Sequence, residues 1–205
     1  MCGICGFFEY KKTAREFPEK SALSRMCTAM SHRGPDDRGE YYSRETGVAL
    51  GHLRLSIIDL SSAGHQPMTD FDQRLRIVYN GEIYNFKELA DDLRKRGHRF
   101  QSSSDTEVIL KSYREWGEEC LNKFRGFWAL AIWNEKQKKL ILTSDRIGKK
   151  PLYFADLGGT LIFASEIKGL LASNLLNKDI DYDGLHHYIA LVSVTARHPM
   201  LTPVQ

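Results

Sequence analysis

The stretch that decides the fold class lies at residues 127–133 and consists of Phe127-Trp128-Ala129-Leu130-Ala131-Ile132-Trp133. An apolar run of this length predicts a buried strand. A polar turn over residues 134–139 separates it from a second apolar run, Leu140-Ile141-Leu142-Thr143. Residues 151–154 and 161–164 repeat the pattern around Gly158-Gly159. Strands joined by tight turns pair in the antiparallel sense, so both hairpins indicate antiparallel sheets.

Upstream of these hairpins the sequence predicts further strands at residues 3–10, 48–59 and 75–79. Helices are predicted in separate blocks. Apolar residues recur at helical spacing between Leu23 and Met30, and another helix is expected over residues 181–192. Two capping boxes, Asn85 with Glu88 and Ser104 with Glu107, predict two more helix starts, the first helix ending at Gly97. Helices in blocks beside antiparallel strands predict an α+β fold.

Composition excludes several classes of protein. Apolar residues make up 42% and charged residues 27% of the 205 residues, which excludes wholesale disorder. The net charge of +3 is too small and dispersed to predict a nucleic-acid or membrane partner. No apolar run approaches the ~20 residues needed to span a bilayer, and the N-terminus lacks signal-peptide features. Four cysteines are too few for a disulfide framework, so we expect a soluble, cytoplasmic protein with reduced thiols.

Cys2 stands out because it directly follows Met1. Removal of Met1 would expose a thiol and a free α-amine in one residue. With pKa values near ~8.5 and ~8, the amine can accept the proton of the thiol around neutral pH. Cys2 is thus a candidate nucleophile that carries its own base. Two alternatives stay open: an ordinary residue after a start codon, or a metal or redox Cys2-Gly3-Ile4-Cys5 motif, although no second CxxC exists.

Several polar residues match this chemistry. Arg54 lies in an apolar strand and suits a bidentate grip on a carboxylate. Glu82 and Asp105 could together hold an ammonium group, so the set fits a free amino acid. Asn80 and Gly81 offer a side-chain amide and an unhindered backbone N–H, the two donors of an oxyanion hole. Each also has a structural explanation: Arg54 in an ion pair, Asn80-Gly81 as a turn and Asp105 as a helix cap.

Eight motifs together show that the chain resembles the glutaminase domain of class II, N-terminal-nucleophile glutamine amidotransferases, and most closely that of asparagine synthetases. The resemblance runs in register from residue 1 to about residue 190. The motifs are Met1-Cys2-Gly3-Ile4-Cys5-Gly6, His32-Arg33-Gly34-Pro35-Asp36-Asp37, residues 51–60, Gln66-Pro67-Met68, Tyr79-Asn80-Gly81-Glu82-Ile83-Tyr84-Asn85, Ser104-Asp105-Thr106-Glu107, Phe124-Arg125-Gly126 and Ser165-Glu166-Ile167-Lys168.

The resemblance implies a role for each matching residue. Cys2 would attack the side-chain amide of L-glutamine, with its own amine as base and acid. Asn80 and Gly81 would hold the oxyanion, and Arg54 the α-carboxylate. The α-ammonium would lie between Glu82 and Asp105, and backbone groups of Ile57 and Ile58 would line the pocket. The fold it implies is a four-layer αββα sandwich of two antiparallel sheets.

The resemblance also implies a partner. Residues 1–178 would form the glutaminase domain, and residues 179–205 a linker and the first helix of a synthetase domain that this chain lacks. ATP and Mg²⁺ are expected only in that domain, because no Ser-Gly-Gly-x-Asp-Ser loop is present, and this chain is expected to need no cofactor or metal. A homodimer stays open. Asp145-Arg146-Ile147-Gly148 and residues 192–198 depart from the family pattern, which leaves the nitrogen acceptor in doubt.

Two other functions remain alternatives. The same glutaminase could serve an acceptor other than aspartate, or the chain could be a catalytically silent module that senses glutamine. A sensor needs groups that bind the amino acid but no nucleophile, so Cys2 argues against silence.

Overall fold

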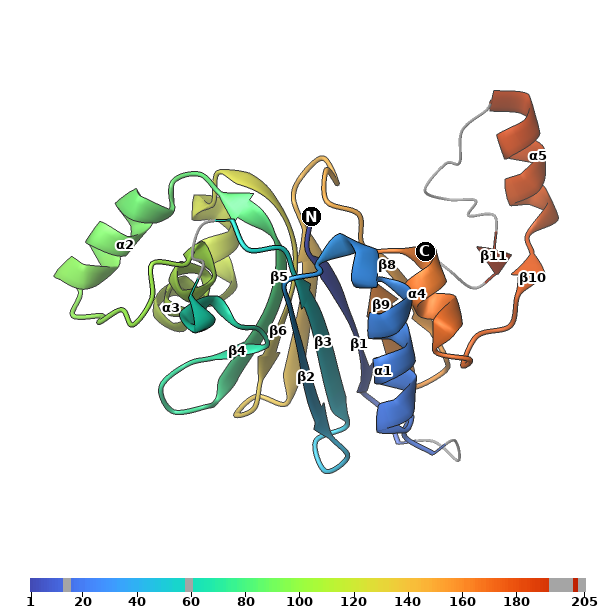
Figure 1. Cartoon of the computed structure of the whole chain (residues 1–205), viewed down its shortest axis with the longest axis horizontal. Helices are drawn as coiled ribbons and strands as arrows, with labels where there is room; N and C mark the ends of the chain where they lie inside the picture. Colours follow the sequence, from blue (N-terminus) through green and yellow to red (C-terminus); the bar gives the residue numbers. More distant parts are fainter. Residues whose placement is uncertain (13–15, 58–60, 192–200, 203–205) are drawn as a thin grey trace.

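The computed structural model describes residues 1–12, 16–57, 61–191 and 201–202. It confirms an α+β fold with four layers, in which two antiparallel sheets lie face to face and helices cover both outer faces (Figure 1). The strands are β1 Gly3–Glu9, β2 Asp37–Ser43, β3 Val48–Arg54, β4 Met68–Thr69, β5 Leu75–Ile83, β6 Gly126–Asn134, β7 Lys139–Ser144, β8 Tyr153–Asp156, β9 Thr160–Ala164, β10 Asp179–Ile180 and β11 Leu201–Thr202. The α-helices are α1 Lys20–Ala29, α2 Phe86–Lys95, α3 Asp105–Trp116, α4 Ile167–Ala172 and α5 Tyr182–Leu191.

The first sheet is assembled from two distant parts of the chain. Its strand order is β2-β3-β1-β9-β8, so β1 lies at the centre between β3 and β9. The second sheet has the order β4-β5-β6-β7 and comes from one continuous segment, residues 68–144. That segment also contains α2 and α3. A small third pair, β10 and β11, lies beside α5 away from the sandwich (Figure 1).

The period-two alternation of strand side chains separates the layers. In β1, Cys5 and Phe7 face α1 and α4, whereas Ile4 faces the second sheet. The layer between the sheets is apolar and includes Leu50 and Trp133. The outer faces of β5 and β6 pack on α2 and α3 and form the largest apolar cluster. The buried apolar run at residues 127–133 is the centre of this arrangement, because β6 contributes to both apolar layers.

Most predicted helices and strands are confirmed. Some strands end at other residues than predicted, because a strand ends where its pairing with neighbouring strands ends. Both hairpins, β6–β7 and β8–β9, pair antiparallel. The strand expected over residues 48–59 ends as β3 at Arg54, where its pairing with β1 and β2 stops. The strand expected at residues 75–79 continues as β5 to Ile83, because β6 pairs with it as far as Gly126. The helix expected over residues 181–192 is α5.

Both predicted helix starts are confirmed, since α2 begins directly after Asn85 and α3 directly after Ser104, but the expected capping-box hydrogen bonds are only partly present. Asn85 makes no side-chain cap for α2; its amide donates to the carbonyl of Lys123 and accepts from the N–H of Arg125. Tertiary hydrogen bonds therefore outcompete the local cap. Ser104 does cap α3, since its hydroxyl accepts from the N–H of Thr106. The Glu107 carboxylate accepts instead from the N–H groups of the preceding loop.

The described helices include none long and apolar enough to cross a membrane. The domain boundary expected at residue 178 stays a prediction.

Candidate active site

One pocket, of about 680 Å³ including its open mouth, lies at an end of the sandwich where strands of both sheets terminate. The first sheet contributes Cys2 and Arg54, and the second contributes Asn80, Gly81 and Glu82. The full lining is Met1, Cys2, Arg54, Leu55, Ile57, Gly64, Gln66, Tyr79, Asn80, Gly81, Glu82, Ser104, Asp105, Thr106 and Lys150. Every predicted site residue within the described part of the chain therefore lines this one pocket.

Cys2 lies just before β1, beside the end of β3. The register sets Gly3 opposite Leu53, so the chain end and the end of β3 meet here. The Sγ of Cys2 accepts from the N–H of Leu55 at 3.4 Å and lies 3.6 Å from its carbonyl oxygen. Burial raises the pKa of the Cys2 thiol, and the backbone hydrogen bond from Leu55 only partly opposes this. At neutral pH the thiol is protonated and needs a base to react.

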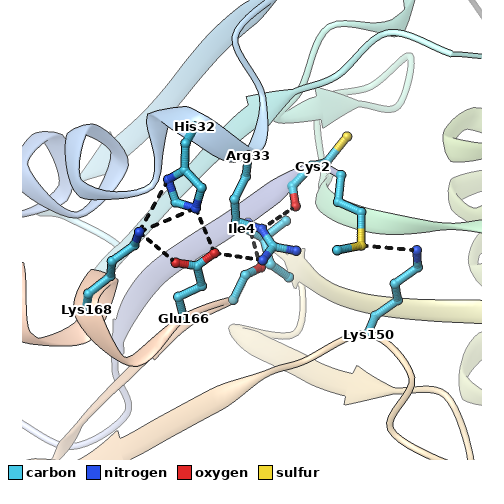
Figure 2. A network of polar contacts seen from close by, with 9 residues as sticks. Cys2, Ile4, His32, Arg33, Lys150, Glu166 and Lys168 are labelled. Carbon is cyan, nitrogen blue, oxygen red and sulfur yellow. Dashed lines mark hydrogen bonds and ion pairs between the residues drawn. The ribbon is translucent and has the colours of Figure 1, made fainter.

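The backbone of Cys2 is held by an ionic cluster on the other side of β1 (Figure 2). Arg33 donates from Nε to the carbonyl of Cys2 at 2.9 Å and from its guanidinium to Glu166 at 2.8 Å. His32 and Lys168 contact the same carboxylate at 2.9 and 3.2 Å. Although burial opposes ionisation, these three basic groups lower the pKa of Glu166 to about 2. The cluster thus anchors Cys2, which none of the described strands pairs with.

Arg54 is the last residue of β3 and is 8% exposed. Its guanidinium donates to the carbonyl of Ser61 at 2.8 Å while lining the pocket. Gly64 packs against it so closely that a Cβ there would lie 2.1 Å from an Arg54 nitrogen. The loop that contains Ser61 and Gly64 thus holds the guanidinium in place. The guanidinium presents a fixed positive charge to the pocket.

Asn80 and Gly81 supply hydrogen-bond donors to the pocket that Cys2 also lines. Asn80 is 2% exposed, and its Nδ2 has no hydrogen-bond partner among the described residues. Leaving a buried amide unsatisfied costs about 1–3 kcal/mol, so this donor is expected to have a ligand. In β5 the backbone groups of Leu75 and Ile83 bond Asp70 and Asp105 on the side away from β6. Alternation directs the N–H of Gly81 to that same side, toward the pocket.

Two carboxylates complete the pocket. Asp105 is buried at the start of α3, and its Oδ2 accepts from the Tyr79 hydroxyl at 2.8 Å and the N–H of Ile83 at 3.1 Å. Burial raises the pKa of Asp105, and these two hydrogen bonds oppose the rise. Glu82 lines the same pocket and is exposed. A cation between these two carboxylates would offset the burial of Asp105.

Ile57 lines the pocket but is 71% exposed, whereas Ile58 lies outside the described residues. Sequence reasoning did not single out Gln66, Tyr79, Thr106 or Lys150, which line the pocket as well. Gln66, Tyr79 and Thr106 lie within the motifs that carry the family resemblance, and this was the one sequence signal that could have pointed to them. Lys150 comes from a loop, and only the three-dimensional structure places it beside Met1, whose Sδ lies 3.8 Å from its Nζ.

The alternative of a Cys2–Cys5 metal or redox motif finds no geometric support. Cys5 is buried on the opposite face of the first sheet, where its Sγ lies 3.6 Å from that of Cys27. Cys27 and Cys120 are buried core residues. Within the described ranges, no group of three or more His, Cys, Asp or Glu side chains is placed to hold a metal ion.

The lining of the pocket therefore combines a thiol, two hydrogen-bond donors, a guanidinium and two carboxylates. This is the arrangement that an amino acid with a side-chain carbonyl requires, because each of its polar groups meets a complementary one. The roles of individual residues stay predictions.

Comparisons with known proteins agree with this geometry. Residues 1–205 match the family described as glutamine amidotransferase domain. Asparagine synthetase [glutamine-hydrolyzing] 3 of Bacillus subtilis is 41% identical over 193 residues, which cover 93% of this chain and 31% of that protein. Putative asparagine synthetase [glutamine-hydrolyzing] 2 of Methanocaldococcus jannaschii is 40% identical over 209 residues, covering 93% and 39%.

A third relative carries a different name: amidase chry2 of Gibberella zeae is 36% identical over 186 residues, covering 85% of this chain and 27% of that protein. Among solved structures, glutamine phosphoribosylpyrophosphate amidotransferase from B. subtilis aligns with a TM-score of 0.69 and 20% identity. That alignment covers 84% of this chain and 44% of the solved one, and it supports the fold alone.

Proposed function

Because the chain belongs to the glutamine amidotransferase domain family, we propose that its pocket hydrolyses L-glutamine to L-glutamate and ammonia, with Cys2 as the nucleophile. The observation that carries the proposal is the buried Nδ2 of Asn80, which has no partner among the described residues and lines the same pocket as the Cys2 thiol. An unsatisfied donor opposite a nucleophile suits an oxyanion that exists only during the reaction.

The reaction proceeds in two steps. The α-amine of Cys2, free once Met1 is removed, takes the thiol proton, and the sulfur attacks the side-chain carbonyl carbon of glutamine. Asn80 Nδ2 and the Gly81 N–H stabilise the oxyanion. The protonated amine then gives its proton to the leaving nitrogen, and ammonia departs from a thioester. Water attacks the thioester, which releases glutamate and restores the thiol.

The charged residues hold the ends of the substrate. Arg54 binds the α-carboxylate through its planar guanidinium, which matches a carboxylate in a bidentate pair. Glu82 and Asp105 bind the α-ammonium. These contacts act equally before and during the reaction, and they select a free amino acid over a peptide-bound one.

The ammonia needs an acceptor site that the pocket does not contain. The chain spans only about a third of the length of the curated relatives it matches. We propose that it supplies nitrogen to a synthetase domain, as the printed names of these relatives suggest, in a cytoplasmic protein. ATP and Mg²⁺ would bind in that domain, and a homodimer stays open. The amidase named above keeps an acceptor other than aspartate open. A silent glutamine sensor is disfavoured, because Cys2 lies at the pocket with its thiol beside the end of β3.

The 205-residue chain with Met1 removed is expected to release ammonia and glutamate from glutamine in equal amounts. It is also expected to form no asparagine when aspartate, ATP and Mg²⁺ are added. A coupled assay measures the glutamate, and amino-acid analysis detects any asparagine. A folded, processed chain that releases no ammonia overturns the proposed activity, and ATP-dependent asparagine formation overturns the assignment of synthesis to another domain.

Substitutions of the two kinds of contact should separate binding from catalysis. Arg54→Lys is expected mainly to raise KM for glutamine, since lysine loses the bidentate grip that acts on ground and transition states alike. Asn80→Ala is expected mainly to lower kcat, by about 10²–10³-fold, because its donor acts where charge develops. Steady-state kinetics of both variants test the roles; an effect of Asn80→Ala on KM alone would contradict its assignment.

A further inference from the structure

The edge of β5 next to Asn80 is left without a neighbouring strand. β4 pairs with β5 only at Ile77 and Arg76, and none of the described strands continues this pairing toward the pocket. Backbone groups of Tyr79 and Gly81 face this edge by alternation. Backbone N–H and C=O groups that are buried without a hydrogen-bond partner destabilise a sheet, so other groups are expected to bond them. Gly81 is the oxyanion donor of the proposed function, so its edge must stay open to substrate.

Tyr79 is instead capped by two side chains. Its N–H donates to Oε1 of Gln66 at 2.7 Å, and its carbonyl accepts from Nε2 of His52 at 3.1 Å. Gln66 comes from the loop before β4, in the same half of the site. His52 comes from β3, in the other sheet, and its side chain is completely buried. The bond from His52 therefore crosses the layer between the two sheets.

The protonation state of His52 is fixed by its surroundings. A carbonyl only accepts, so Nε2 carries the proton, and Nδ1 has no hydrogen-bond partner among the described residues. Burial lowers the pKa of His52 to about 3. The hydrogen bond to Tyr79 and the charge of Asp37 oppose this shift, and Arg54 and His65 add to it. His52 is neutral at neutral pH and does not line the pocket. It is thus unsuited to serve as the base for Cys2.

The position of the bond links the two halves of the site. His52 lies two residues before Arg54 on the same face of β3, and Tyr79 directly precedes Asn80. The neighbouring inter-sheet contacts are apolar and have no preferred direction along the strands. A hydrogen bond does have direction, so it can define how far β5 lies along β3.

We propose that His52 is a positioning residue, which sets the oxyanion donors Asn80 and Gly81 against Cys2 by holding the Tyr79 carbonyl across the sheets. This inference rests on the proposed glutaminase function. A misplacement of catalytic donors by about 1 Å can cost a hundredfold in rate. Loss of the bond should therefore act on kcat, while Arg54 and the carboxylates still bind glutamine.

Three substitutions of His52 test this. Leucine removes the donor, so we expect His52→Leu to lower kcat by about 10- to 100-fold with KM changed less than threefold. Glutamine carries its Nε2 the same number of bonds from the backbone as histidine does, so His52→Gln should recover most of kcat. The amide nitrogen of His52→Asn corresponds to Nδ1 and does not reach Tyr79, so it should stay impaired. The fall of kcat/KM at low pH, which is set by the α-amine of Cys2 in the proposed mechanism, should occur at the same pH in all three variants.

A double-mutant cycle and a matched control separate positioning from general loosening. In an Asn80→Ala background, His52→Leu should lower kcat by less than threefold more, since both act on the same oxyanion. Leu50→Val, two residues earlier on the same buried face, should lower Tm without coupling to Asn80→Ala. Thermal unfolding of each variant accompanies the kinetics.

Several results would overturn the inference while leaving the proposed function intact. They are a wild-type kcat in His52→Leu, equal kcat in the glutamine and asparagine variants, a rise in KM alone, or full additivity with Asn80→Ala. If His52→Leu does not fold, the comparison of His52→Gln with His52→Asn decides. A wild-type chain that releases no ammonia contradicts the proposed function itself.

Discussion

Cys2→Ala and Cys2→Ser are expected to abolish glutamine hydrolysis, with a loss of at least about 10⁴-fold in kcat. In the proposed mechanism the sulfur forms the covalent intermediate, and removing an activated nucleophile has cost about 10⁶-fold where it was measured in another hydrolase. The fold should survive, because Cys2 precedes the paired part of β1 and its backbone contact to Arg33 does not involve the side chain. Ammonia release and thermal unfolding of each variant test both halves of this expectation.

A glutamine-like diazoketone should label Cys2 alone. The other three thiols are at most 1% exposed, so the reagent does not reach them in the folded protein. Cys120→Ala is a suitable control, since Cys120 belongs to the apolar cluster under α3 and lies outside the pocket. Peptide mapping after labelling locates the adduct. A label on Cys5, Cys27 or Cys120 with parallel loss of activity would refute the assignment of Cys2.

Retention of Met1 is expected to lower activity by about 10²–10⁴-fold, the usual contribution of a general base. With Met1 in place the nitrogen of Cys2 is a peptide amide and accepts no proton near neutral pH. Burial raises the pKa of the Cys2 thiol, so the thiol does not ionise by itself. The side chain of Met1 also lines the pocket, where it contacts Lys150. Activity therefore requires the processed chain.

Intact-mass measurement separates the two forms in one preparation, and ammonia release should follow the fraction that lacks Met1. In the processed form the α-amine must be neutral to act as base, so kcat/KM should fall as pH drops below the amine pKa, ordinarily about 8. Normal turnover by a chain that fully retains Met1 would exclude this mechanism. The sequence alone would then offer His32 or His52 as the base. His52 is unsuited because its Nε2 bonds the Tyr79 carbonyl, and Nε2 of His32 bonds Glu166, so the search would widen to other groups.

The sequence predicts the chemistry of the site better than its geometry. The position of Cys2 after Met1 indicates a nucleophile without any structure, and strand and turn patterns predict both hairpins. Arg54, Asn80, Glu82 and Asp105 fit an amino-acid site as a set, and the family resemblance implies a role for each, but the local patterns alone do not show that they converge. That they meet in one pocket depends on the packing of two sheets, which local patterns do not encode.

The errors have the same origin. Asn85 has the local pattern of a cap, but the carbonyl of Lys123 and the N–H of Arg125 compete for its amide across 38 and 40 residues. The strand predicted through Asp59 stops at Arg54, where the pairing of β3 with β1 and β2 ends in the described part of the chain. His52 lies in an alternating strand that predicts only a buried position. Its partner, 27 residues away in the other sheet, gives it a role.

The central place of β1 has a consequence for the order of events during synthesis. Within this chain β1 is made before the other strands, and one of its two neighbours, β9, follows about 150 residues later. The intervening segment with β4 to β7 can form its own sheet in the meantime, as contiguous units do. Cys2, the proposed nucleophile, therefore stays outside a finished pocket until β9 has been translated. During that interval the proposed removal of Met1 would meet no folded pocket, and the nascent chain would not yet consume glutamine.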